Sequence, residues 1–201
     1  MADPRKSLKE LAEEFYMWLG HCISSWALVE GELFQICRDA IGCREDQAAI
    51  IYVRTPTIAS RLKLTDELLQ NVLPSREDNH GKQHPDAIAW ASVRTKCDEL
   101  IPTRNRLAHQ PVTAPNAYLH YFFGGRPDSK PEHNAWIQSH VGGAERLRGN
   151  RKGIKPLKLK DLEHHLSQTK LLTEQMKEFR EKRLQKLLAK REQPQSPQNQ
   201  G

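Results

Sequence analysis

Residues 104 to 109 read Arg-Asn-Arg-Leu-Ala-His and place three chemically capable side chains close together at the end of an apolar helical run. The guanidinium of Arg104 can hold a phosphate through a fixed fork of N–H donors. The imidazole of His109 can accept or release a proton near neutral pH. The amide of Asn105 can hydrogen-bond to either partner. Together these side chains suit a site that binds a phosphodiester and moves a proton on it.

The spacing from arginine to histidine is not specific by itself. Arg126 and His133 have a comparable spacing, but two prolines lie between them and exclude a regular helical turn. Only Arg104 and His109 fall on a predicted helix. The alternative interpretation of His109 is a residue at a helix C-terminus that bonds a free carbonyl. The alternative for Arg104 is a structural ion pair, with Glu30 as its partner.

The helices that must position this motif follow from the apolar periodicity. Apolar side chains from Leu8 to Ala40 recur in alternating steps of three and four residues, which is typical of one amphipathic helix. Pro102 is expected to kink or restart a later helix. The predicted helices cover 7–41, 45–54, 57–73, 86–109 and 158–190. The sequence therefore predicts an all-α protein, a bundle of about four main helices.

Residues 111–156 differ in character from the helical segments. Aromatic residues and a Gly-, Pro- and Asp-rich stretch predict an inserted β-hairpin over about 117–141, in which 117–123 pairs with 134–141. The last residues are rich in Gln and Pro, a composition typical of disorder. The predicted organisation is a single helical domain (1–191) with an insertion (111–156) and a disordered tail (192–201).

Basic residues are concentrated toward the C-terminus. The chain has a formal net charge of +6, and residues 144 to 191 hold 15 Lys and Arg against 6 Asp and Glu. Such a segment attracts nucleic acid through its charge. A solvated helix face has the same composition, so charge alone does not separate the two interpretations.

The remaining sequence features argue against a membrane protein, a secreted protein and a metal-binding protein. The mean hydropathy is −0.73, and no apolar run approaches the roughly 20 residues of a membrane helix. The N-terminal residues lack the apolar segment of a signal peptide. The four cysteines form no Cys-x-x-Cys pair, which favours reduced thiols in a cytoplasmic protein. His80 and His84 have a metal-ligand spacing but no third ligand, so neither a metal nor a cofactor is expected.

The motif and its surroundings resemble the HEPN superfamily. Members carry an arginine, then four to six residues, then a histidine, commonly with a polar residue after the arginine. The run Arg104-Asn105-Arg106-Leu107-Ala108-His109 matches the short form of this pattern. Trp26 and Glu30, in the spacing Trp-x-x-x-Glu, look like part of the first helix of several bacterial members. The resemblance covers residues 8 to 110 and the final helix.

The resemblance implies a HEPN-like bundle and a metal-independent endoribonuclease in a bacterial toxin or defence setting. In such a site His109 is the general base on the ribose 2′-hydroxyl, and Arg104 stabilises charge on the phosphate. Asn105 orients the phosphate or the histidine, and Glu30 supports Arg104. The phosphates on either side of the cleaved bond are expected to contact a group of basic residues. These residues bind RNA without recognising its base sequence. This group consists of Arg106, Arg146, Arg148, Arg151 and Lys152.

The resemblance also implies partners. HEPN-like proteins commonly build their site across a two-fold axis, so we expect a homodimer whose two His109 side chains face a shared cleft. RNA is the other expected partner. One alternative is a toxin that a separate nucleotidyltransferase antitoxin neutralises. The alternative, from another class, is a catalytically silent helical dimer that binds or scaffolds a partner. Convergence of Arg104 and His109 on an open cleft favours the nuclease, and a sealed ion pair at Arg104 favours the scaffold.

Overall fold

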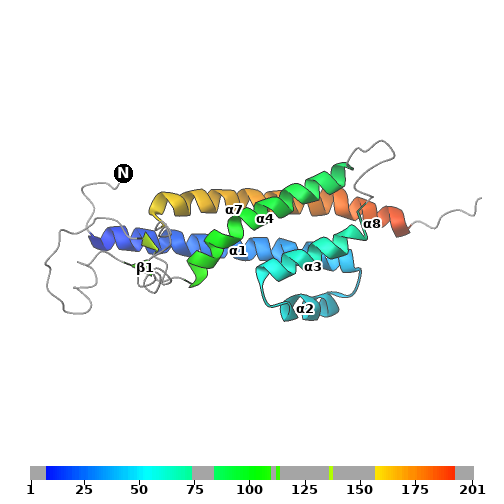
Figure 1. Ribbon diagram of the computed structural model, residues 1–201, viewed down its shortest axis with the longest axis horizontal. Coiled ribbons are helices and arrows are strands. Elements are labelled where there is room, and N and C mark those ends of the chain that lie inside the picture. The colour runs from blue at the N-terminus through cyan, green and yellow to red at the C-terminus, as the bar shows by residue number, and fades with distance from the viewer. Residues whose placement is uncertain (1–7, 74–83, 110–111, 114–135, 138–156, 193–201) are drawn as a thin grey trace, which may run out of the picture. The chain divides into compact units, whose positions relative to one another are not determined.

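The structure, a computed structural model, is predominantly helical, which confirms the predicted fold class at this level. It describes residues 8–73, 84–109, 112–113, 136–137 and 157–192. The helices are α1 (Leu8–Ile41), α2 (Glu45–Arg54), α3 (Ile58–Gln70), α4 (Pro85–His109), α7 (Leu159–Phe179) and α8 (Gln185–Glu192) (Figure 1). A π-helical turn, η1 (Arg180–Leu184), joins α7 to α8. None of the helices in the described ranges combines the length and the apolar character that crossing a membrane requires.

Local sequence signals account for two of the helix boundaries. Gly42 follows α1 with φ of 68°, and its N–H donates to the carbonyl of Arg38 at 3.0 Å. Glycine adopts this left-handed conformation without a steric penalty, so it ends the helix. At the start of α3, Thr57 Oγ1 accepts a hydrogen bond from the backbone N–H of Ser60 at 3.1 Å. This bond satisfies one of the amides that the first turn leaves unpaired.

Helix α4 continues through Pro102 and ends at His109. The helix predicted over 86–109 is thus observed as one element, without the restart that was one of the two expected effects of Pro102. A proline removes one backbone donor, but the residues on both sides keep the helical path because their side chains are buried. Ile101 before it is 8% exposed and Leu107 after it is 5% exposed. Apolar burial of this kind offsets a lost hydrogen bond within a helix.

The described residues belong to two compact units, each assembled from separate segments of the chain. Unit 1 comprises residues 1–26 and 102–169, and unit 2 comprises residues 27–101 and 170–201. The divisions fall inside α1, α4 and α7, so each of these helices contributes one part to each unit. The prediction of one domain over 1–191 stays a prediction.

Unit 1 is built around an apolar cluster. Phe15 and Cys22 of α1 pack with Leu107 of α4 and with side chains at the start of α7. The members from α7 and the residues just before it are Leu157, Leu162 and Leu166. The thiol of Cys22 donates to the carbonyl of Leu162 at 3.2 Å, and burial raises the pKa of this thiol to about 11. The cysteine therefore behaves here as a small apolar group.

Two short strands also belong to unit 1. Strand β1 (Val112–Thr113) pairs antiparallel with β2 (Trp136–Ile137), and Val112 lies opposite Ile137. Strand β2 falls within the second strand of the predicted hairpin. The first predicted strand, 117–123, lies outside the described residues, as does most of the tail 192–201. The hairpin as predicted therefore remains untested.

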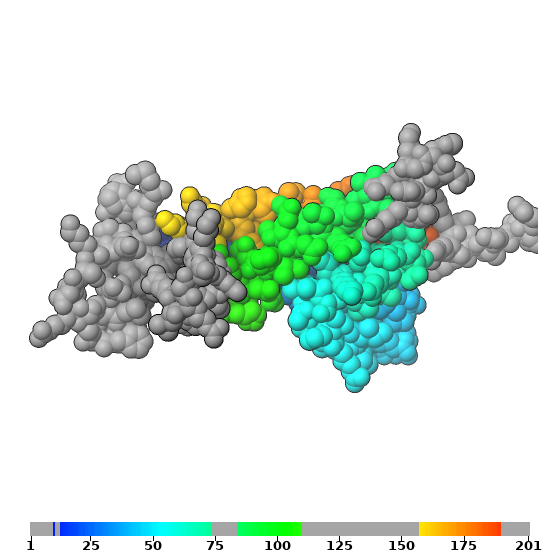
Figure 2. Space-filling view, viewed as in Figure 1, coloured from blue at the N-terminus to red at the C-terminus, as the bar shows by residue number. Residues whose placement is uncertain are grey.

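Unit 2 packs α2 and α3 with the second part of α1, the first part of α4 and the C-terminal helices. Figure 2 shows α3 in cyan beside α4 in green. Trp90 of α4 stacks at a tilt on Phe179, with ring centroids 5.5 Å apart. Leu33 and Leu69 are fully buried, and Tyr52 of α2 is 5% exposed. Large apolar and aromatic side chains thus form the core of this unit.

Candidate functional site

The sequence motif occupies the last two turns of α4, in unit 1. Leu107 is buried in the apolar cluster, whereas Asn105 and His109 are exposed and Arg104 is half-buried. Arg104 Nη1 donates to Asn105 Oδ1 at 3.3 Å. This bond engages the carbonyl end of the amide, which leaves the Nδ2 end of Asn105 to donate to a ligand.

The positions around the helix decide which side chains of the motif share a face. At 3.6 residues per turn, Asn105 and His109 lie roughly 40° apart, whereas Arg104 and His109 lie roughly 140° apart. Asn105 and His109 therefore face the same solvent region one turn apart. Arg104 does not point along that face, and its guanidinium is connected to it through Asn105. The structure thus brings together Arg104 with Asn105, and Asn105 with His109.

Arg106 lies beside the start of α7. Its side chain is half-buried, and this burial lowers the pKa of the guanidinium, while the nearby carboxylate of Asp161 acts in the opposite direction. Asp161 also accepts the backbone N–H of Lys158 at 2.8 Å. An arginine remains charged even when its pKa falls, so Arg106 keeps a cation next to the motif.

Glu30, expected to support Arg104, lies in unit 2. Its carboxylate Oε2 accepts from Arg61 Nη1 at 2.9 Å, and its backbone carbonyl accepts from the hydroxyl of Tyr52 at 3.1 Å. The guanidinium of Arg61 also lies 5.0 Å from the centre of the Tyr52 ring. These contacts join α1, α2 and α3. A pairing of Glu30 with Arg104 would involve both units and stays a prediction.

The other basic candidates, Arg146, Arg148, Arg151 and Lys152, lie outside the described residues. So does His80, whereas His84 is half-buried with Nδ1 3.6 Å from Asp86 Oδ2. Among the residues that the structure describes, no three His, Cys, Asp or Glu side chains are grouped to bind a metal ion.

A buried aromatic pair in unit 1 was not identified from the sequence. His165 is 3% exposed and stacks on Trp26, with ring centroids 6.1 Å apart. Burial, together with the neighbouring His164, lowers the pKa of His165 to about 4. The imidazole is therefore neutral near pH 7. A usable signal was its position three residues after Leu162, on the buried face of α7.

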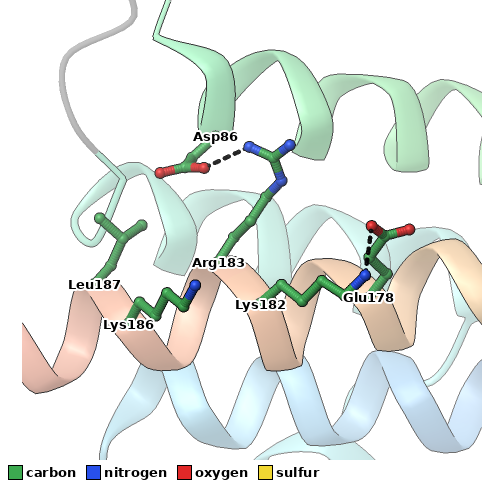
Figure 3. Close-up of a pocket in the computed structure, with 6 residues that line it drawn as sticks. All are labelled: Asp86, Glu178, Lys182, Arg183, Lys186 and Leu187. Carbon is green, nitrogen blue, oxygen red and sulfur yellow. Dashed lines mark hydrogen bonds and ion pairs between the residues drawn. The ribbon is translucent and has the colours of Figure 1, made fainter.

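A basic pocket in unit 2 is the second feature that the sequence analysis missed. It measures about 280 Å³ and is lined by Asp86, Glu178, Lys182, Arg183, Lys186 and Leu187 (Figure 3). Arg183 Nη1 donates to Asp86 Oδ1 at 2.7 Å, and Lys182 Nζ donates to Glu178 Oε1 at 3.2 Å. The pocket does not include any residue of the motif in α4.

Comparisons with protein-family models, with curated proteins and with solved structures find no match to this chain. We therefore infer the function from the chemistry of the two sites.

Proposed function

We propose that the protein is a metal-independent endoribonuclease with a HEPN-like fold, and that Arg104, Asn105 and His109 form its catalytic site. One observation carries the proposal. The end of α4 presents Asn105 and His109 on one exposed face, and Arg104 is hydrogen-bonded to Asn105. These three groups supply a proton acceptor, an oriented amide and a cation for a phosphodiester.

The reaction uses the ribose 2′-hydroxyl as the nucleophile. His109 removes its proton, the 2′-oxygen forms a bond to the adjacent phosphorus, and the bond from phosphorus to the 5′-oxygen breaks. A water molecule donates a proton to the departing 5′-oxygen, and the protonated His109 then returns its proton to the solvent. The products are a 2′,3′-cyclic phosphate and a 5′-hydroxyl. Arg104 stabilises the charge that develops on the phosphate oxygens.

The proposal includes a homodimer. Arg104 and His109 lie roughly 140° apart around α4, so a single helix does not direct both groups at one phosphate. A second copy related by a two-fold axis would supply the complementary group, with the two His109 side chains facing a shared cleft. The proposal also includes bacterial toxin or defence activity in the cytoplasm and an antitoxin partner. It further includes the inserted β-hairpin expected over about 117–141. Glu30 is proposed to support Arg104. Arg106 is proposed to contact RNA together with Arg146, Arg148, Arg151 and Lys152.

A cleavage assay tests the proposal. Single-stranded RNA of mixed sequence is incubated with the full chain in the presence of a chelator, and the products are analysed by gel and by mass. We expect a 2′,3′-cyclic phosphate end, no cleavage of DNA, and a loss of roughly 100- to 10,000-fold in rate for His109→Ala. The control is His164→Ala, because His164 is an exposed histidine of the same unit. Cleavage that requires magnesium, or that His109→Ala leaves at full rate, would reject the mechanism.

The second candidate function is a silent helical dimer that binds a partner. It is favoured by α2, which exposes three large apolar side chains: Ile50 is 56% exposed, Ile51 43% and Val53 69%. Neighbouring exposed apolar side chains of this kind are typical of interaction surfaces. If the wild-type chain cuts no RNA in the assay but light scattering shows a dimer, this second function is supported instead.

A further inference from the structure

The basic pocket of unit 2 contains more positive charge than its own carboxylates balance. Three cations line it, Lys182, Arg183 and Lys186, against two carboxylates, Asp86 and Glu178. Arg183 and Lys182 each pair with one carboxylate. Among the described residues, none forms an ion pair with Lys186. One positive charge on the pocket wall is therefore not matched from within.

Two of these three cations, Lys182 and Arg183, are held by a carboxylate partner before any ligand arrives. Figure 3 shows Lys182, Arg183 and Lys186 projecting from one stretch of helix, with Asp86 of α4 opposite Arg183. The bond from Arg183 to Asp86, at 2.7 Å, uses one of the five N–H donors of the guanidinium. Asp86 is itself largely buried, its side chain being 16% exposed. The remaining donors of Arg183 are thus oriented by a fixed partner.

The π-helical turn η1 places these cations on the pocket side. Phe179 and Leu184 are both buried, at 2% and 0% exposed, and they are five residues apart. In a regular α-helix the next inward position after Phe179 would fall three or four residues later, at Lys182 or Arg183. The N–H of Gln185 bonds instead to the carbonyl of Arg180, which is the five-residue spacing of a π-helix. This extra residue allows Leu184 to face inward.

The π-helical turn is itself informative. π-helical turns are rare, and they occur frequently at functional sites. Here Arg180 anchors the start of the turn, since its Nε donates to Glu32 Oε2 at 3.2 Å. Arg183 anchors the later part through Asp86. The turn therefore contains two of the six residues that line the basic pocket, Lys182 and Arg183.

We propose that this pocket binds a phosphate group, carried by a free nucleotide or by the backbone of a nucleic acid. Lysine acts as a point charge on phosphate, and arginine bonds to it through its planar fork of donors. A volume of about 280 Å³ accommodates one phosphate with part of an attached sugar or base. Leu187 supplies an apolar wall for that attachment. This site does not depend on the proposed cleavage, because it involves none of the residues of the α4 motif.

The test uses the full chain with two probes. One is a fluorescein-labelled single-stranded DNA of ten nucleotides, which lacks the 2′-hydroxyl and so is not a substrate for the proposed cleavage. The other is inorganic pyrophosphate, measured by calorimetry and as a competitor of the DNA. The double variant Lys182→Gln/Lys186→Gln removes two pocket charges. The matched control is Lys170→Gln/Lys177→Gln, which removes two exposed charges from α7 in the same unit.

We expect the pocket variant to weaken binding by about tenfold or more, because charged hydrogen bonds to phosphate are lost. The control is expected to stay within about twofold. Binding of pyrophosphate alone assigns the site to free phosphate compounds, and binding of DNA alone assigns it to a nucleic-acid backbone. The proposal is overturned if neither probe binds the wild-type chain at about 1 mM. It is also overturned if the two double variants weaken binding equally, since the effect would then be one of net charge.

Discussion

The two units differ in how fully their buried polar groups are hydrogen-bonded. In unit 2, the buried carboxylate of Asp66 accepts from Trp90 Nε1 at 2.8 Å and from Arg94 Nη1 at 2.6 Å. In unit 1, Ser25 Oγ, Trp26 Nε1 and His165 Nε2 are buried without a hydrogen-bond partner among the described residues. In unit 2 the same is true of Asp39 Oδ2, although the other oxygen of this carboxylate accepts from Arg38 Nη2 at 2.7 Å. Both units contain a buried tryptophan, but only Trp90 has its N–H paired.

This difference has an energetic meaning. A buried polar group without a partner costs about 1–3 kcal/mol, whereas a satisfied network orders the structure around it. Natural proteins depart from full pairing chiefly at sites that also serve a function. Unit 1, which contains the Arg104–His109 motif, has three of the four such groups found among the described residues. We infer that the hydrogen-bonded network stabilises unit 2. In unit 1 the unpaired groups lower the free energy of unfolding below the value that its apolar cluster would give.

The largest effect is expected from Asp66→Ala in unit 2. The substitution leaves the N–H of Trp90 buried without its partner and removes the anion beside Arg94. We expect a loss of about 3 kcal/mol in the free energy of unfolding, at the low end for a broken buried ion pair because Arg94 is partly exposed. Urea denaturation followed by circular dichroism measures it. Asp98→Ala is the control, since Asp98 is an exposed carboxylate 4.0 Å from the same arginine, and an equal loss there would contradict the argument.

Mild acid is expected to destabilise unit 1 through His165. Burial lowers the pKa of His165 from 6.5 to about 4 in the folded protein, so the unfolded chain binds this proton first. Stability is therefore fully present above pH 6.5 and falls as the pH drops from 6.5 toward 4. At pH 4.5 the loss is about 2–3 kcal/mol, since each unit of pKa corresponds to about 1.4 kcal/mol.

A replacement that cannot titrate tests this assignment. His165→Phe keeps an aromatic ring against Trp26, so the stability of this variant should vary less between pH 6.5 and 5 than that of the wild type. His164→Gln serves as the control, because His164 is exposed. If His165→Phe retained the full pH dependence, the titrating group would lie elsewhere.

The main helices were predictable because their apolar periodicity is long and regular. The helix predicted over 7–41 is observed as Leu8–Ile41, and the one predicted over 45–54 as Glu45–Arg54. The final helix, predicted as continuous over 158–190, is interrupted by η1. A single extra residue changes the helical phase only locally. The five-residue step from Phe179 to Leu184 was its one trace in the sequence.

The site was predictable only in part. The exposure of His109 near a helix end follows from its place after Leu107 and before Pro111. The partner of Glu30 does not follow from the sequence, because Arg61 lies 31 residues away and the two meet only when α1 and α3 pack together. Pairs of this kind depend on tertiary packing, and so does the choice of which polar groups remain unpaired in unit 1.

A matched pair of tryptophan substitutions isolates the hydrogen bond that distinguishes the units. Trp90→Phe and Trp26→Phe remove the same atoms from buried positions, at 2% and 3% exposed. Only Trp90→Phe breaks a bond, the one to the carboxylate of Asp66. We expect Trp90→Phe to cost about 2 kcal/mol more than Trp26→Phe, the usual size for a hydrogen bond to a charged group. Equal losses in thermal or urea denaturation would show that the N–H of Trp26 is satisfied in solution.

The smallest change in stability is expected from two glycine substitutions in α1, one in each unit. Gly20 lies in the part of α1 that belongs to unit 1, and Gly31 in the part that belongs to unit 2. A Cβ added at either position meets no atom within 4 Å. Alanine has the higher helix propensity, so each substitution is expected to stabilise its helix by about 0.5–1 kcal/mol.

The distribution of that gain shows whether the units unfold separately. If unit 1 is the less stable unit and opens by itself, Gly20→Ala should slow hydrogen exchange at the amides of unit 1. Gly31→Ala should slow exchange at the amides of unit 2, as measured at single amides. If both substitutions protect every slowly exchanging amide equally, the chain unfolds as one cooperative body. The unpaired groups of unit 1 would then lower the stability of the whole protein rather than that of unit 1 alone, and the contrast between the units would be structural without being thermodynamic.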